Sequence, residues 1–540
     1  MIFLKRYPFI LLIIINILIY FPLITAIKSV NPDAQIIYDQ LLTFSGPIDY
    51  ITKLFQFQTI DFQPIRDLTF FLDLFFFKNF NINISIFQNF SLWIGCCYLI
   101  FKIQRIVFQE KAVILCFLFL LLFSVNPLFT YTISWGVARK HLLSFFFILF
   151  ASLEIVTLKE LTIKKSLKFT FFYVCSCLSQ PITILWPLWT FIFLIRKKNT
   201  NNFHLFKYLS PLTITFILLS VTNFFYYQNS DVFHHHYASK TTQLFNISDK
   251  ILAFGHYHFQ IFFPFKLAFN YELGDFSVLI GLLFFVVSSL FIYKKKVSPD
   301  VLAWLIPGYL SLLVILNTPQ HLFDSYLLFP SFSVFMLSNH FLPSRTNKFQ
   351  MSLIIFIVLI FGLISHFESK KWLNPVILTE SSFQNRPNCK NAVNFLKMTY
   401  ESHLQVSDEL RTYLKNFDCL SSQGATQYRA TSHTAMISNI LFHEDLIPLA
   451  ERIKKLKILS ENNLIPHLTL AALYLKNSNP DEADLVILEI IKKMKNHSIS
   501  GKEFHPITAY YVHPYCQKKS WEECLNITNK LSKKSNNFYL

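Results

Sequence analysis

Two short polar stretches near the start of the chain carry residue types that can move protons and hold phosphate. Asp39 lies in the sequence IYDQ, and Arg66 and Asp67 lie side by side just after Pro64. A carboxylate at a membrane surface can act as general base toward an acceptor hydroxyl, and a guanidinium offers a planar fork that fits phosphate. A helix cap or a solvated loop acid would use Asp39 equally well, so that interpretation stays open.

Two later stretches add polar side chains of the same kinds. Arg139 and Lys140 are the only Lys or Arg residues between positions 126 and 144. Cations at membrane depth need a partner, and a lipid phosphate is a natural one, whereas snorkelling to headgroups is the structural alternative. A third stretch, DSYLLFPS, begins at Asp324 and includes Tyr326. We therefore expect substrate contacts from these two stretches as well.

Histidines raise the question of a metal site, which the spacing does not favour. Three consecutive His occupy 234–236, with His256 and His258 downstream. Three adjacent His cannot all face one ion, and no carboxylate has a matching spacing, so a solvated or lipid-facing loop is the better interpretation. No Gly-rich phosphate loop and no G-x-S-x-G sequence occurs either. We expect no metal and no cofactor.

The composition indicates that these residues are positioned by membrane helices. The chain has 540 residues, of which 53% are hydrophobic and 15% are charged. Apolar blocks of about 17–25 residues recur through the first two-thirds, the length that crosses a bilayer as a helix. The net charge of +17 would suit nucleic acid, but the Lys and Arg residues fall mostly in short loops between apolar blocks, so no nucleic-acid partner is expected.

About eleven spans and their orientation follow from these blocks and loops. The predicted spans lie near 8–27, 86–103, 112–126, 141–158, 168–179, 181–195, 208–226, 277–293, 301–317, 325–342 and 350–366. Five basic loops fall on the side of the N-terminus, which the positive-inside rule places in the cytoplasm. The loops 28–85, 126–141 and 227–276 and the whole tail are then on the outer side.

The tail, 367–540, changes character and is expected to form a second helical domain. Leu470, Ala471, Tyr474 and Ala483 in 466–495 fit the small-and-large pattern of a tetratricopeptide repeat (TPR). An unrelated helical domain remains an alternative. An even number of cysteines would fit disulfides in an extracytoplasmic tail, with the pairing left open; they are Cys389, Cys419, Cys516 and Cys524.

Four motifs together resemble a known family. QPIRDLTFFLD at 63–73 resembles its Arg-Pro-Leu-Arg-x-Leu-Thr-x-x-Leu-Asp stretch, and 126–143 resembles its His-Pro…Glu…Trp…Arg-Lys-Asp-Leu-Leu loop. SQPITILWP at 179–187 resembles Ser-Lys-Pro…Pro, and DSYLLFPS at 324–331 resembles Arg-Tyr-x-x-x-Pro-Ser. The family is the GT-C class of polytopic glycosyltransferases that carry tetratricopeptide repeats, the transmembrane-and-TPR O-mannosyltransferase-like proteins and their bacterial relatives.

The resemblance implies an all-α GT-C-like membrane domain over 1–366, followed by the TPR-like domain. It also implies a polyprenyl-phosphate sugar as donor, transferred at the outer face to a protein or glycan acceptor that the tail could dock. Asp39 matches the first acid of the family's Asp-Asp pair, Arg139 and Lys140 its phosphate-side pair, and Arg66 and Asp67 its first-loop motif. Five positions depart from the pattern: Gln40, Gln63, Asn126, His141 and Gln180.

These expectations lead to one function and two alternatives. A metal-independent, inverting glycosyltransferase would use Asp39 as base and Arg139 with Lys140 against the departing lipid phosphate. The departures motivate a catalytically silent relative that binds lipid-linked glycans or docks partners through the tail. A lipid-linked glycan transporter is the third possibility, although no internal transmembrane repeat is evident. A bacterial inner membrane with a periplasmic tail is the preferred location.

Overall fold

The structure, a computed structural model, divides the chain into two compact units, Met1–Arg386 and Pro387–Leu540. It describes residues 8–25, 41–42, 44–56, 62–80, 84–109, 113–158, 160, 162–196, 202–229, 247–265, 267–268, 276–294, 297, 302–316, 324–342, 348–387, 389–401 and 449–460, with isolated positions between 407 and 486. In these residues every regular element is a helix and no strand occurs. The predicted all-α class is therefore confirmed for the described part of the chain.

Each of the eleven apolar segments predicted from the sequence contains a helix in the first unit. An unbroken apolar run satisfies its backbone polar groups internally only as a helix, which explains the agreement. These helices are α2 (Pro8–Ile24), α6 (Ser85–Val107), α7 (Val113–Ser124), α9 (Arg139–Val156), α10 (Ile163–Ser179), α11 (Trp186–Arg196), α12 (Asn202–Asn229), α15 (Phe276–Lys294), α17 (Leu305–Leu316), α18 (Leu328–His340) and α19 (Lys348–Lys371).

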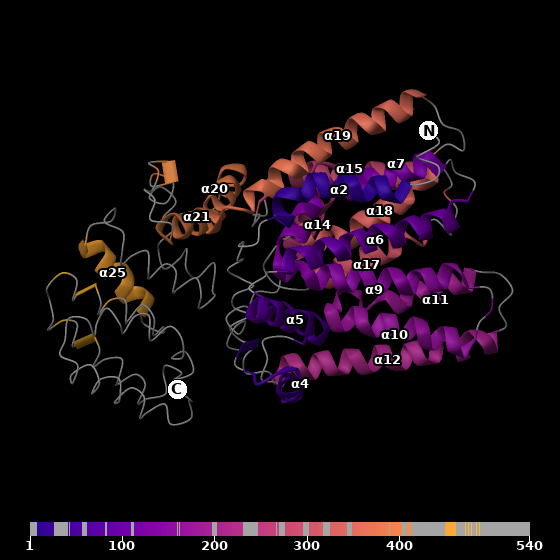
Figure 1. The fold of residues 1–540 in the computed structure, drawn as a ribbon, viewed down its shortest axis with the longest axis horizontal. Helices are drawn as coiled ribbons and strands as arrows, with labels where there is room; N and C mark the ends of the chain where they lie inside the picture. Colours follow the sequence, from indigo (N-terminus) through magenta and orange to yellow (C-terminus); the bar gives the residue numbers. More distant parts are fainter. Residues whose placement is uncertain are drawn as a thin grey trace. The chain divides into compact units, whose positions relative to one another are not determined.

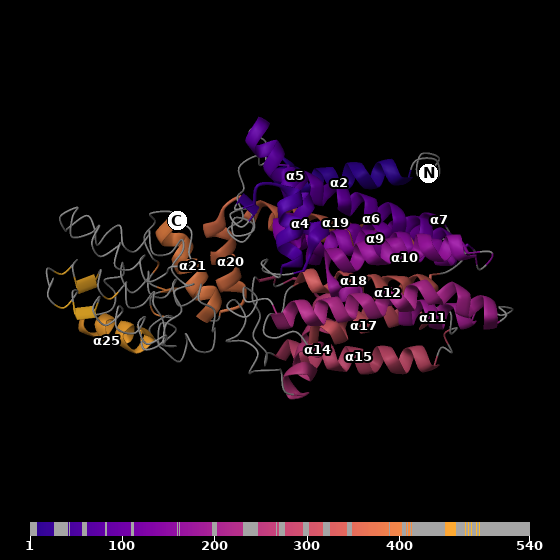
Figure 2. The same cartoon turned by 90° about the horizontal axis from the view of Figure 1, so that it is seen from below.

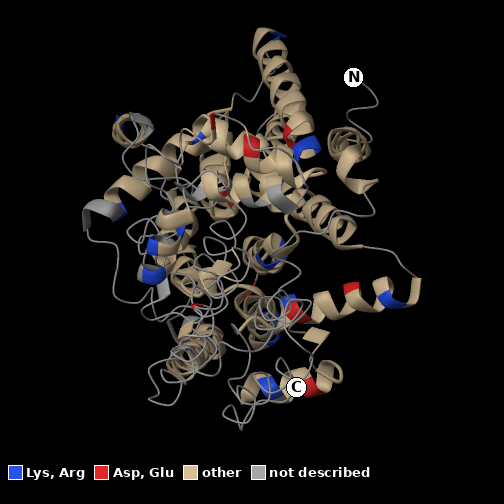
Figure 3. Cartoon of the chain, turned by 90° about the vertical axis from the view of Figure 1, so that its left-hand side faces the viewer, with Lys and Arg blue, Asp and Glu red and all other residues tan. Residues whose placement is uncertain are grey.

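Four helices of the described residues are long and apolar enough to cross a membrane, and a bent pair makes a fifth if it is one span. Other apolar helices are shorter, between 10 and 17 residues. Few charged residues lie along the helices, as Figure 3 shows. The four are Ser85–Val107, Gly136–Val156, Tyr208–Tyr226 and Lys348–Lys371, and the pair is Val113–Ser124 with Pro127–Ser134. A membrane protein is supported, while the count of about eleven spans stays a prediction.

Shorter helices lie at one end of the long ones, which we call the polar end. Figures 1 and 2 show α4, α5 and α14 at this end, with the long helices running side by side away from it. They fall within the predicted outer loops 28–85 and 227–276. The short elements of the unit are α4 (Pro47–Phe55), α5 (Pro64–Phe80), η1 (Pro127–Phe129), α8 (Thr130–Ser134), η2 (Gly136–Ala138), η3 (Pro181–Thr183), α14 (Ile247–Phe262), η4 (Asp324–Leu327) and α20 (Pro375–Asn385).

Helix α9 lies at the centre of the bundle and packs against α6 on one side and α10 on the other. Its side chains Leu142, Phe145 and Leu149 are fully buried in the main apolar core. The Phe145 ring meets the ring of Phe332 from α18 edge to face, with centroids 5.5 Å apart. This packing fixes the start of α9, which is where the polar residues of the second motif lie.

Helices α14 and α15 approach each other closely through two glycines. A Cβ atom built on Gly281 would lie 1.8 Å from the carbonyl oxygen of Gly255. Only a residue without a side chain fits there, because real Cβ atoms never come that close to a backbone oxygen. The two glycines therefore set the distance between the predicted outer loop and the helix that follows it.

The boundary between the units lies further along the chain than the sequence placed it. The sequence divided the domains at 366/367, whereas α19 continues to Lys371 and α20 still belongs to the first unit. The second unit contains α21 (Cys389–Glu401) and α25 (Leu449–Ser460). Most of 466–495 and the side chains of the four tail cysteines are outside the described residues, so the TPR-like tail and its disulfides stay predictions.

Candidate functional site

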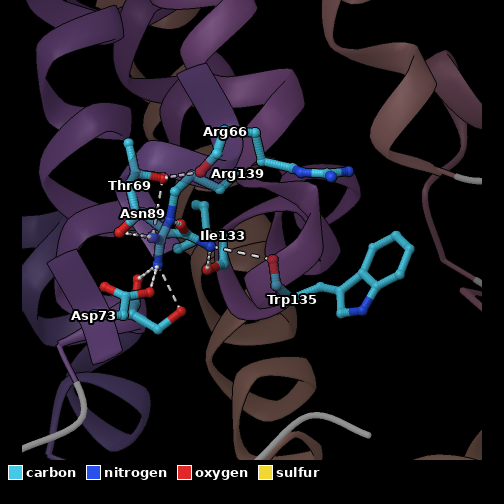
Figure 4. A network of polar contacts seen from close by, with 8 residues as sticks. Arg66, Thr69, Asp73, Asn89, Ile133, Trp135 and Arg139 are labelled. Carbon is cyan, nitrogen blue, oxygen red and sulfur yellow. Dashed lines mark hydrogen bonds and ion pairs between the residues drawn. The ribbon is translucent and has the colours of Figure 1, made fainter. Parts of the chain in front are cut away.

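The guanidinium of Arg139, the first residue of α9, is fully buried and contacts two other helices (Figure 4). Its Nη2 lies 2.7 Å from Oδ2 of Asp73 on α5. Its Nε donates to Oδ1 of Asn89 on α6 at 3.0 Å. Nη1 donates to Oγ1 of Thr69 at 3.2 Å, and Nη2 donates to Oγ of Ser85 at 2.6 Å. Arg139 thus joins α5 and α6 to the start of α9.

A buried guanidinium is stable only when a carboxylate and further hydrogen-bond acceptors surround it. Arg139 meets this condition within the protein, and its guanidinium also lies over the ring of Phe70, 4.7 Å from the centroid. A lipid phosphate would have to displace Asp73 to bind here. Arg139 is therefore placed to hold the structure of the site, and the phosphate contact predicted for it would require a rearrangement.

Asn89 extends this network into the second motif. Its Nδ2 donates to the carbonyl oxygens of Ile133 and Trp135, each at 3.1 Å. Trp135 has extended backbone angles, φ −90° and ψ 115°, which separate α8 from η2. A helix end leaves carbonyl groups without partners inside the helix, and the Asn89 amide supplies the missing donor here. The loop that leads into Arg139 is fixed as a result.

Arg66 and Asp67 form a second buried pair in the first turn of α5. Nε and Nη2 of Arg66 each lie 2.6 Å from Oδ1 of Asp67. The hydroxyl of Tyr50 on α4 donates to the other oxygen, Oδ2, at 2.6 Å. Nη1 of Arg66 donates to Oε1 of Gln63 at 2.9 Å. Gln63 stands where the family has Arg, and it serves here as an acceptor for Arg66.

Two further residues at the start of α9 contact the remaining motifs. The His141 ring meets the ring of Tyr326 in η4 edge to face, with centroids 5.1 Å apart. The hydroxyl of Ser144 donates to the carbonyl oxygen of Gln180 at 3.2 Å, and lies 2.9 Å from the hydroxyl oxygen of Ser176. Arg139, with these two residues, brings all four sequence motifs together around the first turns of α9.

Most of the predicted site residues therefore lie at the polar end. Arg66, Asp67 and Arg139 belong to the two buried networks, although Figure 4 shows the Arg66 guanidinium directed away from that of Arg139. Lys140 is half-buried beside Arg139. The predicted base, Asp39, lies outside the described residues.

The fourth motif, DSYLLFPS at 324–331, contributes to an open cleft at the same end. Asp324, which is buried, lines this cleft, while the neighbouring Tyr326 packs on His141. The cleft holds about 360 Å³ of empty space, part of it open to solvent. Its polar and aromatic lining comes from α8, η4 and the stretch from α19 to α20: Tyr131, Asp324, Glu368, Lys371, Trp372 and Ser381.

Sequence reasoning missed the partners of Arg139 and the cleft. Ser85 and Asn89 are polar residues spaced four apart at the start of a largely apolar segment, and this spacing places them on one helix face. That spacing was a usable signal for a buried polar partner. Glu368, Lys371 and Trp372 follow directly on the last apolar run and were assigned to the tail domain, although their charges and ring so near a span could have indicated a site.

No group of three His, Cys, Asp or Glu side chains suited to a metal ion occurs among the described residues. His256 and His258 lie buried in α14, and the His triplet at 234–236 is not described. Burial, the larger cause, and the charge of Arg386 together lower the pKa of His256 to about 3. Burial also lowers the pKa of His258, opposed by its hydrogen bond to the carbonyl of Phe254. Both rings are neutral at pH 7.

Comparison with known proteins gives no match among family models, curated proteins or solved structures. The resemblance to the GT-C glycosyltransferases stays a prediction that depends on the four motifs. The geometry adds that these motifs, which are far apart in the sequence, meet at one end of the helices.

Proposed function

We propose that the chain is an integral-membrane glycosyltransferase that moves a sugar from a polyprenyl-phosphate donor to an acceptor at the polar end. The observation that carries this proposal is the meeting of the four motifs at the start of α9, through Arg139, His141 and Ser144. Residues that merely cap separate loops would have no reason to converge. An apolar bundle that gathers its buried charges at one end is the arrangement expected for chemistry at a membrane surface.

The reaction is an inverting displacement at the anomeric carbon of the donor sugar. Asp39 removes the proton from the acceptor hydroxyl, and the resulting oxygen forms a bond to the anomeric carbon. The bond from that carbon to the phosphate oxygen breaks, and its electron pair leaves with the polyprenyl phosphate. The products are the glycosylated acceptor, the lipid phosphate and a protonated Asp39, which loses its proton to water.

The cations at the polar end fill distinct roles in this proposal. Lys140 stabilises the charge that develops on the departing phosphate, since preorganised cations act most strongly where water is excluded. Arg66 joins it once the phosphate displaces Asp67, which lies 2.6 Å from the guanidinium. Arg139 holds α5, α6 and α9 in place through Asp73 and Asn89. Asp324 and Tyr326 contact substrate from the side of η4.

The surface beside the buried pairs suits a lipid-linked donor. Helix α4 buries Tyr50 and Leu54 but exposes Ile48 and Phe55, by 82% and 68%. Such an apolar face at the end of a membrane bundle is suited to the headgroup region of the bilayer. A polyprenyl chain could approach along it and present its phosphate to Arg66. The proposed setting is a bacterial inner membrane, with a cytoplasmic N-terminus and a periplasmic tail.

Transfer by the purified protein tests the proposal. The full chain in lipid nanodiscs would be supplied with polyprenyl-phosphate mannose, glucose or galactose and with membrane extract as a source of acceptors. Sugar release from the donor and its appearance on an acceptor are expected for the wild type and not for Asp39→Asn. Asp49→Asn is the matched control, because Asp49 belongs to the same predicted loop and, among the described residues, accepts a hydrogen bond from the amide of the exposed Ser45. Undiminished transfer by Asp39→Asn would exclude it as the base.

A second candidate function is a glycan-binding protein without turnover. The observation that favours it is the engagement of both arginines by carboxylates, Arg139 with Asp73 and Arg66 with Asp67. An active transferase would need a cation able to turn toward the phosphate. Donor binding by the wild type with no sugar release in the same nanodisc assay would favour this candidate over the enzyme.

A further inference from the structure

The open cleft at the polar end has walls that come from several parts of the first unit. Its lining includes residues of α8 and η4, the end of α19, and α20. The cleft lies beside the Arg139 network and is separate from it, because none of Asp73, Asn89 or Arg139 lines it.

The polar groups of the cleft are held in place before any ligand binds. Nζ of Lys371 lies 2.6 Å from Oε1 of Glu368 and donates to Oγ of Ser381 at 2.8 Å. The first two residues are one turn apart on α19, and Ser381 comes from α20. The entropic cost of ordering these long side chains is therefore met when the protein folds, and it does not weaken ligand binding.

A fixed aromatic ring adjoins these polar groups. Trp372 is half-buried, and its ring meets Tyr131 edge to face, with centroids 5.2 Å apart. Tyr131 is held in turn by Trp135, at 5.0 Å. Leu267 and Leu378 complete an apolar part of the lining. A rigid ring next to carboxylates, an ammonium and hydroxyls suits a ligand with an apolar face and a polar edge.

The charge of the cleft decides among ligands of that shape. Among the lining residues that the structure describes, Asp324 and Glu368 are acidic and Lys371 is basic, a formal balance of −1. This negative charge would repel a phosphate group, and the Lys371 ammonium is already paired with Glu368. Carboxylates accept hydrogen bonds from hydroxyl groups strongly, so a neutral ring that carries several hydroxyls fits best.

From this geometry we propose that the cleft binds one neutral pyranose ring of a saccharide, stacked on Trp372, with its hydroxyls donating to Asp324 and Glu368. That this saccharide is the acceptor rests on the proposed function, whereas the binding itself does not. The anionic donor phosphate belongs near Lys140 and the buried arginines, none of which lines the cleft. The cleft would then determine which acceptor binds, and the residues at the start of α9 would hold the other motifs in position.

Saturation-transfer NMR on the full chain in nanodiscs, free of sugar-based detergents, tests the binding directly. Free mannose, glucose, galactose and N-acetylglucosamine are the probes, and a dissociation constant on the order of 1 mM is expected for a single ring. Trp372→Ala is expected to weaken binding of the preferred sugar at least ~10-fold, and Trp372→Phe much less. Glu368→Gln keeps the shape of the side chain and is expected to weaken binding by ~3–10-fold.

Phe367→Ala is the matched control, because Phe367 lies on α19 close to both substituted residues and is 59% exposed, and this variant should bind sugar as the wild type does. The proposal would be overturned if Trp372→Ala and Glu368→Gln both bound sugar as tightly as the wild type, or if the folded wild type gave no sugar signal. Displacement of the sugar by inorganic phosphate would overturn it too, since it would show an anion site. Sugar binding without any transfer would support the saccharide site and contradict the proposed transferase activity. Transfer with an acceptor KM that is unchanged in Trp372→Ala would support the transferase activity and contradict the saccharide site.

Discussion

Nη2 of Arg139 lies 2.7 Å from Oδ2 of Asp73, and both side chains are almost completely buried. The pair joins the first residue of α9 to the middle of α5, so it connects the second predicted outer loop to the first. Because the same guanidinium also binds Asn89 and Ser85 of α6, three helices depend on one side chain. The contact between the first two motifs at the start of α9 follows from this arrangement.

Removal of Asp73 is expected to destabilise the protein severely. Asp73→Ala leaves a buried guanidinium without its counter-charge, which costs about 3–5 kcal/mol. The measurement is the free energy of unfolding in a denaturing-detergent titration. Lys168→Ala is the matched control, since the ion pair of Lys168 with Glu154 is exposed, with 56% of the lysine side chain accessible, and such pairs contribute about 0–1 kcal/mol. Similar losses in both variants would contradict the role given to Arg139.

The crossing of α14 and α15 gives a second prediction. Gly281→Ala places a methyl group against the Gly255 carbonyl, and relief of that overlap is expected to cost about 1–3 kcal/mol. Gly46→Ala is the control, because no atom lies within 4 Å of a Cβ built there. Gly46 is the N-cap of α4, so the loss of stability should be no more than about 1 kcal/mol. Thermal unfolding midpoints of the two variants provide the comparison. A Gly281→Ala protein as stable as Gly46→Ala would show that the helices can separate freely.

Acid is expected to destabilise the protein through His256. Its pKa is about 3 in the folded state because burial disfavours the charged ring, against about 6.5 when unfolded. The unfolded state therefore binds the proton first, and stability falls as the pH drops below about 6, by up to about 1.4 kcal/mol per pH unit for this group. Unfolding free energies of the wild type and His256→Gln, each referred to its own value at pH 8, should diverge between pH 6 and 4. Parallel curves would rule out His256 as the source.

The sequence predicted the long helices well because a continuous apolar run has few other ways to satisfy its backbone. It also predicted that a cation at the depth of Arg139 needs a partner. It could not identify that partner, because Asn89 and Thr69 lie 50 and 70 residues away along the chain and meet Arg139 only once α5, α6 and α9 have packed.

The cleft was beyond sequence reasoning for a similar reason. Tyr131 and Trp372 lie far apart in the sequence, on α8 and just after α19, and each alone is an ordinary aromatic residue near a span. Their contact is created by the packing of α19 against α8. The positions of the helices follow from the local composition. A site made of residues that are distant in the sequence depends on tertiary packing, which no local sequence pattern reveals.

Gln63 offers a test of how far the family pattern applies to this chain. Its Oε1 accepts a hydrogen bond from Nη1 of Arg66 at 2.9 Å, and the side chain is 4% exposed. Gln63→Arg, which restores the residue of the family motif, would place two guanidinium groups together in a buried site, and we expect a loss of several kcal/mol, about 3 or more. Gln63→Ala removes only the acceptor and should cost about 1–3 kcal/mol. Gln63→Glu keeps an acceptor at that position and is expected to remain closest to the wild type in unfolding free energy. A Gln63→Arg protein as stable as the wild type and more active in sugar transfer would contradict this prediction. It would show that the site beside Arg66 accommodates a second cation, which the ion pair of Arg66 with Asp67 does not explain.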